Sequence, residues 1–128
     1  MSNRKDSLNL KRLCGSLTRG NFHNVSVYGN SLVLFTDTRT CGVEITEIRG
    51  TANAERGCYT ITFFNARNGE HVCTVAWTGH SVKLRPLCEK VLSMDGQHVL
   101  ANIGQQANKG AIKALLGLNS ECTSSNLL

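Results

Sequence analysis

Three histidines stand where predicted strands begin or end. His23 precedes the first predicted strand, His71 begins the last one, and His80 follows its end beside Gly79. Neutral imidazole is a common metal ligand, and its charge changes near neutral pH. Strand ends around an apolar sheet face could hold a flat hydrophobic ligand. We therefore take these histidines, together with Trp77 of the last strand, as candidate ligand-binding residues.

The six cysteines carry less chemical information than their number suggests. They lie at positions 14, 41, 58, 73, 88 and 122, and no two have the close spacing of a zinc chelate. Most are expected to be buried thiols, because free cysteine is among the most buried residue types. The sequence holds no phosphate-binding loop and no metalloprotease or serine-hydrolase motif. A cysteine–histidine dyad stays open, but the sequence favours a non-catalytic protein.

A second candidate site is the basic N-terminal segment. The chain carries a net charge of +5, and its first 19 residues hold only Asp6 against five basic residues, which are Arg4, Lys5, Lys11, Arg12 and Arg19. Such a cluster could bind the phosphates of a nucleic acid, and that binding would weaken strongly with salt. A solvated helix face is the plainer interpretation of the same charges.

The hydrophobic periodicity predicts the elements that position these residues. Leu10, Leu13 and Leu17 form one helical stripe within a basic helix over residues 1–20, which Ser7 can cap. Residues 22–79 follow the period of strands, residues 82–118 return to a helical period, and residues 119–128 form a tail. The prediction is a single α+β domain over residues 1–128: an antiparallel meander of about five strands with an N-terminal helix and C-terminal helices packed on it.

The last predicted hairpin sets which residues share a sheet face. Asn68–Gly69 suits a two-residue turn, which would place Phe64 opposite Cys73 and Thr60 opposite Trp77. One face would then carry Phe64, Cys73, Val75 and Trp77, and the other Tyr59, Ile61, Phe63, Val72 and Ala76. Both faces would be apolar, so each would need a second layer or a ligand to cover it.

The central strands resemble a known family. The segment Asp37–Arg49, the segment Tyr59–Glu70 and a strand ending in Gly79 look like the intracellular haem-utilisation family of HutX/ChuX-like carriers and HemS/HmuS-like half-repeats. The match runs over about Phe35–Met94. The resemblance implies a carrier of haem or a similar tetrapyrrole, with haem as the possible cofactor. From their positions in this chain, and not from the family's motifs, His80 or His23 is a candidate iron ligand and Arg49 a candidate partner for a haem propionate.

Three functions follow as expectations. The first is a non-catalytic haem-binding protein of haem utilisation, which would form a homodimer to cover a sheet edge. The first alternative is a nucleic-acid-binding module acting through the basic N-terminal segment, and the second is a structural or assembly protein. No stretch is apolar enough to span a membrane, and the start lacks a secretory signal pattern. We therefore expect a cytoplasmic protein with no membrane partner.

Overall fold

The computed structural model describes residues 7–36, 38–50 and 56–93. Their elements follow one another in the order α1 (Leu8–Arg19), β1 (Val25–Tyr28), β2 (Ser31–Phe35), β3 (Cys41–Gly50), β4 (Arg56–Asn65), β5 (His71–His80), the 3-10 helix η1 (Ser81–Leu84) and α2 (Arg85–Leu92). The predicted α+β class is confirmed. Arg4, Lys5, most of the predicted helical segment 82–118 and the predicted tail 119–128 lie outside the described residues.

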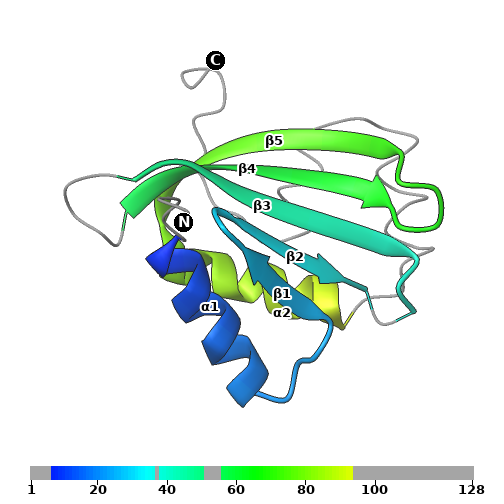
Figure 1. Ribbon diagram of the computed structural model, residues 1–128, viewed down its shortest axis with the longest axis horizontal. Coiled ribbons are helices and arrows are strands. Elements are labelled where there is room, and N and C mark those ends of the chain that lie inside the picture. Colours follow the sequence, from blue (N-terminus) through cyan, green and yellow to red (C-terminus); the bar gives the residue numbers. More distant parts are fainter. Residues whose placement is uncertain (1–6, 37, 51–55, 94–128) are drawn as a thin grey trace, which may run out of the picture.

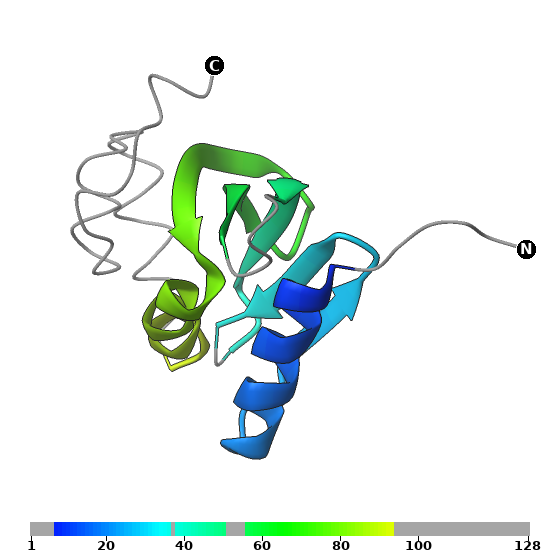
Figure 2. The ribbon, with the colours of Figure 1, turned by 90° about the vertical axis from the view of Figure 1, so that its left-hand side faces the viewer.

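The five strands form one antiparallel meander. Their order in the sheet is β1-β2-β3-β4-β5, so each strand pairs with its neighbour in the sequence. Figures 1 and 2 show α1 and α2 on the same side of the curled sheet. Among the described residues, the sheet therefore has a core face under the helices and an outer face on the opposite side.

Helix α1 forms as its sequence predicts. The Ser7 hydroxyl caps it by accepting a hydrogen bond from the Leu10 amide at 3.1 Å, and Gly20 follows its last residue. The predicted stripe of Leu10, Leu13 and Leu17 is buried against the sheet. Each fully buried leucine contributes roughly 1.5–3 kcal/mol, so this stripe fixes α1 on the core face.

Helix α2 also begins where predicted. Pro86 lies in its first turn, where the missing backbone donor costs nothing, and the 3-10 helix η1 leads directly into it from β5. Its apolar side packs into the same core through Leu87, Cys88, Val91 and Leu92. No helix within the described ranges is long and apolar enough to cross a membrane.

The predicted register of the β4–β5 hairpin is wrong by one residue. Tyr59 pairs with Trp77 and Phe63 with Cys73, and a register shift beside Phe63 places His71 opposite Phe64. A one-residue slip moves every side chain to the other face of a sheet. Trp77 and Tyr59 therefore share the core face, where their rings lie 6.1 Å apart.

The reason for the slip is the loop. The strands are joined by five residues, Ala66–Glu70, and not by a two-residue turn. The Asn65 and Asn68 side chains accept hydrogen bonds from the backbone of Arg67 and Glu70, both at 2.9 Å, and only Gly69 of the predicted turn pair has a positive φ, of 78°. These local bonds stabilise a longer loop than the Asn-Gly pair alone predicts.

The prediction of two apolar faces is consequently also wrong. The core face is apolar, but the outer face of the central strands is rich in hydroxyl groups. Thr62 and Thr74 form a cross-strand hydrogen bond of 3.0 Å, as do Ser31 and Thr46. The helices therefore cover the one strongly apolar face that these strands have.

Candidate functional site

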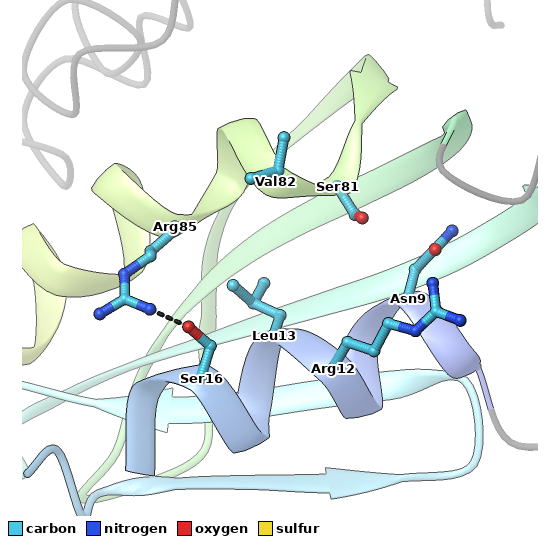
Figure 3. Close-up of a pocket in the computed structure, with 7 residues that line it drawn as sticks. All are labelled: Asn9, Arg12, Leu13, Ser16, Ser81, Val82 and Arg85. Atoms are coloured by element: carbon cyan, nitrogen blue, oxygen red, sulfur yellow. Dashed lines mark hydrogen bonds between the residues drawn. The ribbon is translucent and has the colours of Figure 1, made fainter. Parts of the chain in front are cut away.

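A pocket of about 390 Å³ lies between α1 and the segment formed by η1 and the start of α2 (Figure 3). We call it the α1–η1 pocket. Its lining consists of polar or cationic side chains around an apolar centre: Asn9, Arg12, Leu13, Ser16, Ser81, Val82 and Arg85. No carboxylate is among the described side chains that line it.

Helical spacing places four of these residues on one flank of α1. Asn9, Arg12, Leu13 and Ser16 are separated by three, four or seven positions, so their side chains project from the same side of the helix. The opposite wall forms because β5 ends at His80 and the chain turns at once into η1. Figure 3 shows Ser81 on this wall with its side chain toward α1, and Val82 next to it.

Arg85 closes one end of the pocket. Its Nε donates to Glu89 Oε2 at 2.6 Å, one helical turn away, and a terminal nitrogen of its guanidinium donates to the Ser16 hydroxyl (Figure 3). The side chain is thus held from both helices at once. A planar guanidinium has five donors, so Arg85 keeps donors for a further acceptor.

Arg12 stands at the other end, beside Asn9 (Figure 3). Its side chain is exposed, and it forms no hydrogen bond or ion pair with any residue that the structure describes. An unpaired guanidinium presents a flat fork of donors that matches the oxygens of a phosphate or a carboxylate. Arg12 is therefore the group in this pocket that is most available to an anion.

A buried network supports the floor of the pocket. The Asn9 amide donates to Glu47 Oε2 at 3.2 Å and to the Tyr59 hydroxyl at 3.3 Å, and that hydroxyl donates to Glu47 Oε2 at 3.3 Å. Burial, together with the Glu47 charge, raises the pKa of Tyr59 to about 12. Tyr59 is consequently neutral at pH 7, and the network holds Asn9 in place.

The two helical segments around the pocket are strongly basic. Six basic residues lie on α1, η1 and α2 against the single acidic residue Glu89: Lys11, Arg12, Arg19, Lys83, Arg85 and Lys90. The Glu89 carboxylate is paired with Arg85. The helical layer therefore forms a cationic surface of the kind that attracts polyanions.

The predicted histidines lie far from one another. His71 and His80 are the first and last residues of β5, and a strand of this length spans at most about 30 Å at about 3.3 Å per residue. His23 is exposed before β1, which is at the opposite edge of the sheet from β5. No group of three or more metal-ligating side chains gathers among the described residues. These three histidines therefore do not form one ligand set, and the expectation of a single iron ligand, His80 or His23, stays a prediction.

The remaining predicted residues are also dispersed. Trp77 is only 1% exposed within the core, and its indole nitrogen has no hydrogen-bond partner among the described residues. Arg49 lies in β3 beyond a bulge, paired with Cys58. Of the predicted basic segment, Lys11, Arg12 and Arg19 are exposed on α1, and only Arg12 lines the α1–η1 pocket.

The other residues of the pocket were not identifiable from the sequence pattern. Asn9 and Ser16 are ordinary polar positions on α1, and Ser81 and Arg85 follow the last strand, some 70 residues further along the chain. The exposed flank of the predicted helix was the one available signal, because Arg12 and Ser16 are four positions apart on it.

Comparison with known proteins identifies no relative. No protein-family model, curated protein or solved structure matches the chain. The resemblance to the haem-utilisation family therefore stays a prediction. The function must be argued from the fold and from the pocket between its helices.

Proposed function

We propose that this chain is a non-catalytic nucleic-acid-binding module that holds the phosphate backbone at the α1–η1 pocket. One observation carries the proposal. Arg12, which has no partner among the described residues, and the anchored Arg85 stand at opposite ends of a single pocket, and none of the described side chains that line it is a carboxylate. A phosphate at one end would meet the Arg85 guanidinium beside the Ser16 hydroxyl, and one at the other end would meet the Arg12 guanidinium. Arginine and serine side chains commonly contact phosphates.

The charge of the helical layer supports the same proposal. The three helical elements that border the pocket carry six basic residues and one acidic residue, so a bound backbone would extend over elements of net positive charge beyond the two arginines. Release of counterions from the nucleic acid would then supply much of the affinity. Val82, which is 71% exposed, and the buried Leu13 add an apolar surface for the sugars.

Haem binding is the weaker proposal. Its support is the resemblance of the central strands, and the described histidines do not meet at one place. Homodimer formation and an assembly role likewise stay predictions. Titration with haem under reducing conditions addresses the haem proposal, since axial ligation by a histidine would shift the Soret band.

Charge reversal at Arg12 tests the nucleic-acid proposal. Arg12→Glu replaces an exposed, unpaired side chain, so the fold should be retained while a phosphate contact becomes a repulsion. We expect the affinity for a labelled single-stranded oligonucleotide of mixed sequence to fall about tenfold or more, the worth of a hydrogen bond to a charged group. Fluorescence polarisation measures this change. The salt concentration should be about 50 mM, because binding to phosphates is strongest at low salt.

The matched control is Arg67→Glu. Arg67 is also exposed, but it lies in the β4–β5 loop, at the end of β5 opposite to η1. The two variants change the net charge equally, so a purely global electrostatic effect would weaken both alike. Equal reductions of affinity in the two variants, or no measurable binding by the unaltered protein, would contradict the proposal.

A further inference from the structure

A second depression lies on the outer face of the sheet, at its β1 edge. Its volume is about 340 Å³, and rings, hydroxyls and cationic groups line it, among them His23, Ser26, Tyr28, Val33, Phe35 and Arg39. His23, Ser26, Tyr28 and Arg39 are exposed. We call the surface formed by Tyr28, Phe35 and Arg39 the β1–β2 platform.

At one end of the platform, the side chain of Arg39 lies over the ring of Phe35. The guanidinium carbon of Arg39 lies 4.4 Å from the centre of the Phe35 ring, and its Nη1 donates to Asn24 Oδ1 at 3.3 Å. The backbone of Arg39 has a φ of 58°, a left-handed conformation that is uncommon for a residue with a side chain. A backbone conformation of this kind costs free energy. The fold nevertheless keeps it at Arg39, whose planar guanidinium lies over the Phe35 ring.

The ring beneath Arg39 is held by a second aromatic residue. Phe35 and Phe64 meet edge to face, with their centres 6.0 Å apart and their planes at 85°. Gly42 lies between them on β3, where a Cβ would come within 2.2 Å of the Phe64 ring. The missing side chain of Gly42 lets Phe64 lie against the strand and support Phe35.

Tyr28 forms the other end of the platform. Tyr28 is the last residue of β1 and is 68% exposed. Phe35 lies at the other end of β1, where its backbone amide donates to the carbonyl oxygen of Asn24. Four residues of strand, about 13 Å, therefore separate the two ends, and the small Ser26 and Val33 lie between them. A flat ring could lie over this floor, against either end.

The platform and the α1–η1 pocket lie on opposite sides of the sheet, and the chain from the end of α1 to the start of β1 runs between them. Arg85 reaches the end of α1, since a Cβ added to Gly20 would lie 3.3 Å from its guanidinium. A further pocket of about 510 Å³ lies between the end of α2 and residues 21–24, and His23 lines both this pocket and the platform depression. A chain-like ligand could follow this path from one surface to the other.

We propose that the β1–β2 platform stacks unpaired bases of the strand whose phosphates the α1–η1 pocket holds, so that the ligand is single-stranded. This inference rests on the proposed function. Aromatic rings and arginine planes are the surfaces on which unpaired bases stack, and the bases of a duplex are not free to reach them. The cationic Arg39 stands where the phosphates flanking a stacked base would pass.

Three probes of equal phosphate number separate bases from backbone: a single-stranded oligonucleotide, the same backbone without bases, and a duplex. The unaltered protein should bind the single strand at least about fivefold more tightly than the abasic strand, the lower limit for one stacked base. Tyr28→Ala should abolish much of that preference, and Tyr28→Phe should retain it because the ring remains. Arg12→Glu should weaken binding of both single-stranded probes by a similar factor.

The outcomes distinguish the two proposals. Equal affinity for the base-bearing and abasic strands, or an unchanged preference in Tyr28→Ala, would overturn the platform while leaving the phosphate pocket intact. Tighter binding of the duplex than of the single strand would also overturn it. Failure of every probe to bind would overturn the proposed function itself. Tyr28 is mostly exposed, so circular dichroism should show the same fold in both of its variants.

Discussion

At the scale of single residues, neighbouring groups decide whether an arginine is available to bind an anion, as three arginines in the described part of the chain show. Arg85 is held by Glu89 and Ser16, and Arg39 is held by Asn24 and the Phe35 ring. Arg12 has no such partner among the described residues. The sequence predicted a basic helix face but could not separate Arg12 from its neighbours, because that distinction depends on residues far along the chain.

The thiols provide a prediction about individual side chains. The described cysteines are thiols and form no disulfide with one another, and Cys41 and Cys88 are buried while Cys58 is half-buried. Burial raises the pKa of Cys41 to about 11 and raises that of Cys88 further, so neither forms the reactive thiolate readily. Alkylation of the folded protein at pH 8, followed by peptide mass spectrometry, should modify Cys58 well before these two. Equally rapid modification of Cys88 would contradict the packing of α2.

Tyr59 gives a prediction about pH. Its folded pKa of about 12 lies above the ordinary value of 10, so the unfolded chain loses this proton first. The resulting stabilisation is complete below pH 10 and disappears as the pH rises from 10 towards 12. Tyr59→Phe should lower the free energy of unfolding by about 1 kcal/mol at pH 7, because the hydrogen bonds of the hydroxyl are removed. Above pH 10, the free energy of unfolding of this variant should fall less than that of the unaltered protein.

Urea unfolding, followed by the fluorescence of the buried Trp77, measures this difference at pH 8 and pH 11. The buried thiols also destabilise the fold at high pH, so the comparison between the two proteins is the informative quantity. Parallel decreases of stability in both proteins would show that Tyr59 does not titrate in this way.

At the scale of elements, Gly42 and Phe64 form a matched pair across β3 and β4. Gly42→Ala would place a methyl group where the Phe64 ring lies, and such overpacking costs about 1–3 kcal/mol. Phe64→Ala should relieve that clash, so the double variant should be more stable than the sum of the single changes predicts, by about 0.5 kcal/mol or more. Thermal or urea unfolding of the four proteins measures the coupling, and strictly additive effects would contradict the close packing of this pair.

The same scale shows what local patterns could predict. Leu10, Leu13 and Leu17 specify the buried side of α1 through spacing alone, and Pro86 marks the start of α2. The β4–β5 register was not predictable in this way. It depends on the loop, in which the side chains of Asn65 and Asn68 accept hydrogen bonds from backbone amides two residues further on. That single difference transferred Trp77 from a predicted ligand face to the core.

At the scale of the whole molecule, the helices divide the sheet into two unlike surfaces. The core face is covered by α1 and α2, which present basic side chains outward, while the outer face carries hydroxyls and the β1–β2 platform. Arg12 and Arg85 line one pocket although 73 positions separate them, since the meander returns the chain to the side of α1. This juxtaposition was beyond the reach of any local sequence pattern.

The salt dependence of nucleic-acid binding tests the central claim most directly. The logarithm of the binding constant for a single-stranded oligonucleotide should fall linearly with the logarithm of the salt concentration. The magnitude of this slope should be smaller by about 0.7 for each phosphate that a variant no longer neutralises. Arg12→Gln should reduce the slope by that amount, and Arg67→Gln should leave it unchanged. A slope near zero for the unaltered protein, or the same reduction in both variants, would contradict the assignment of the α1–η1 pocket as the phosphate site.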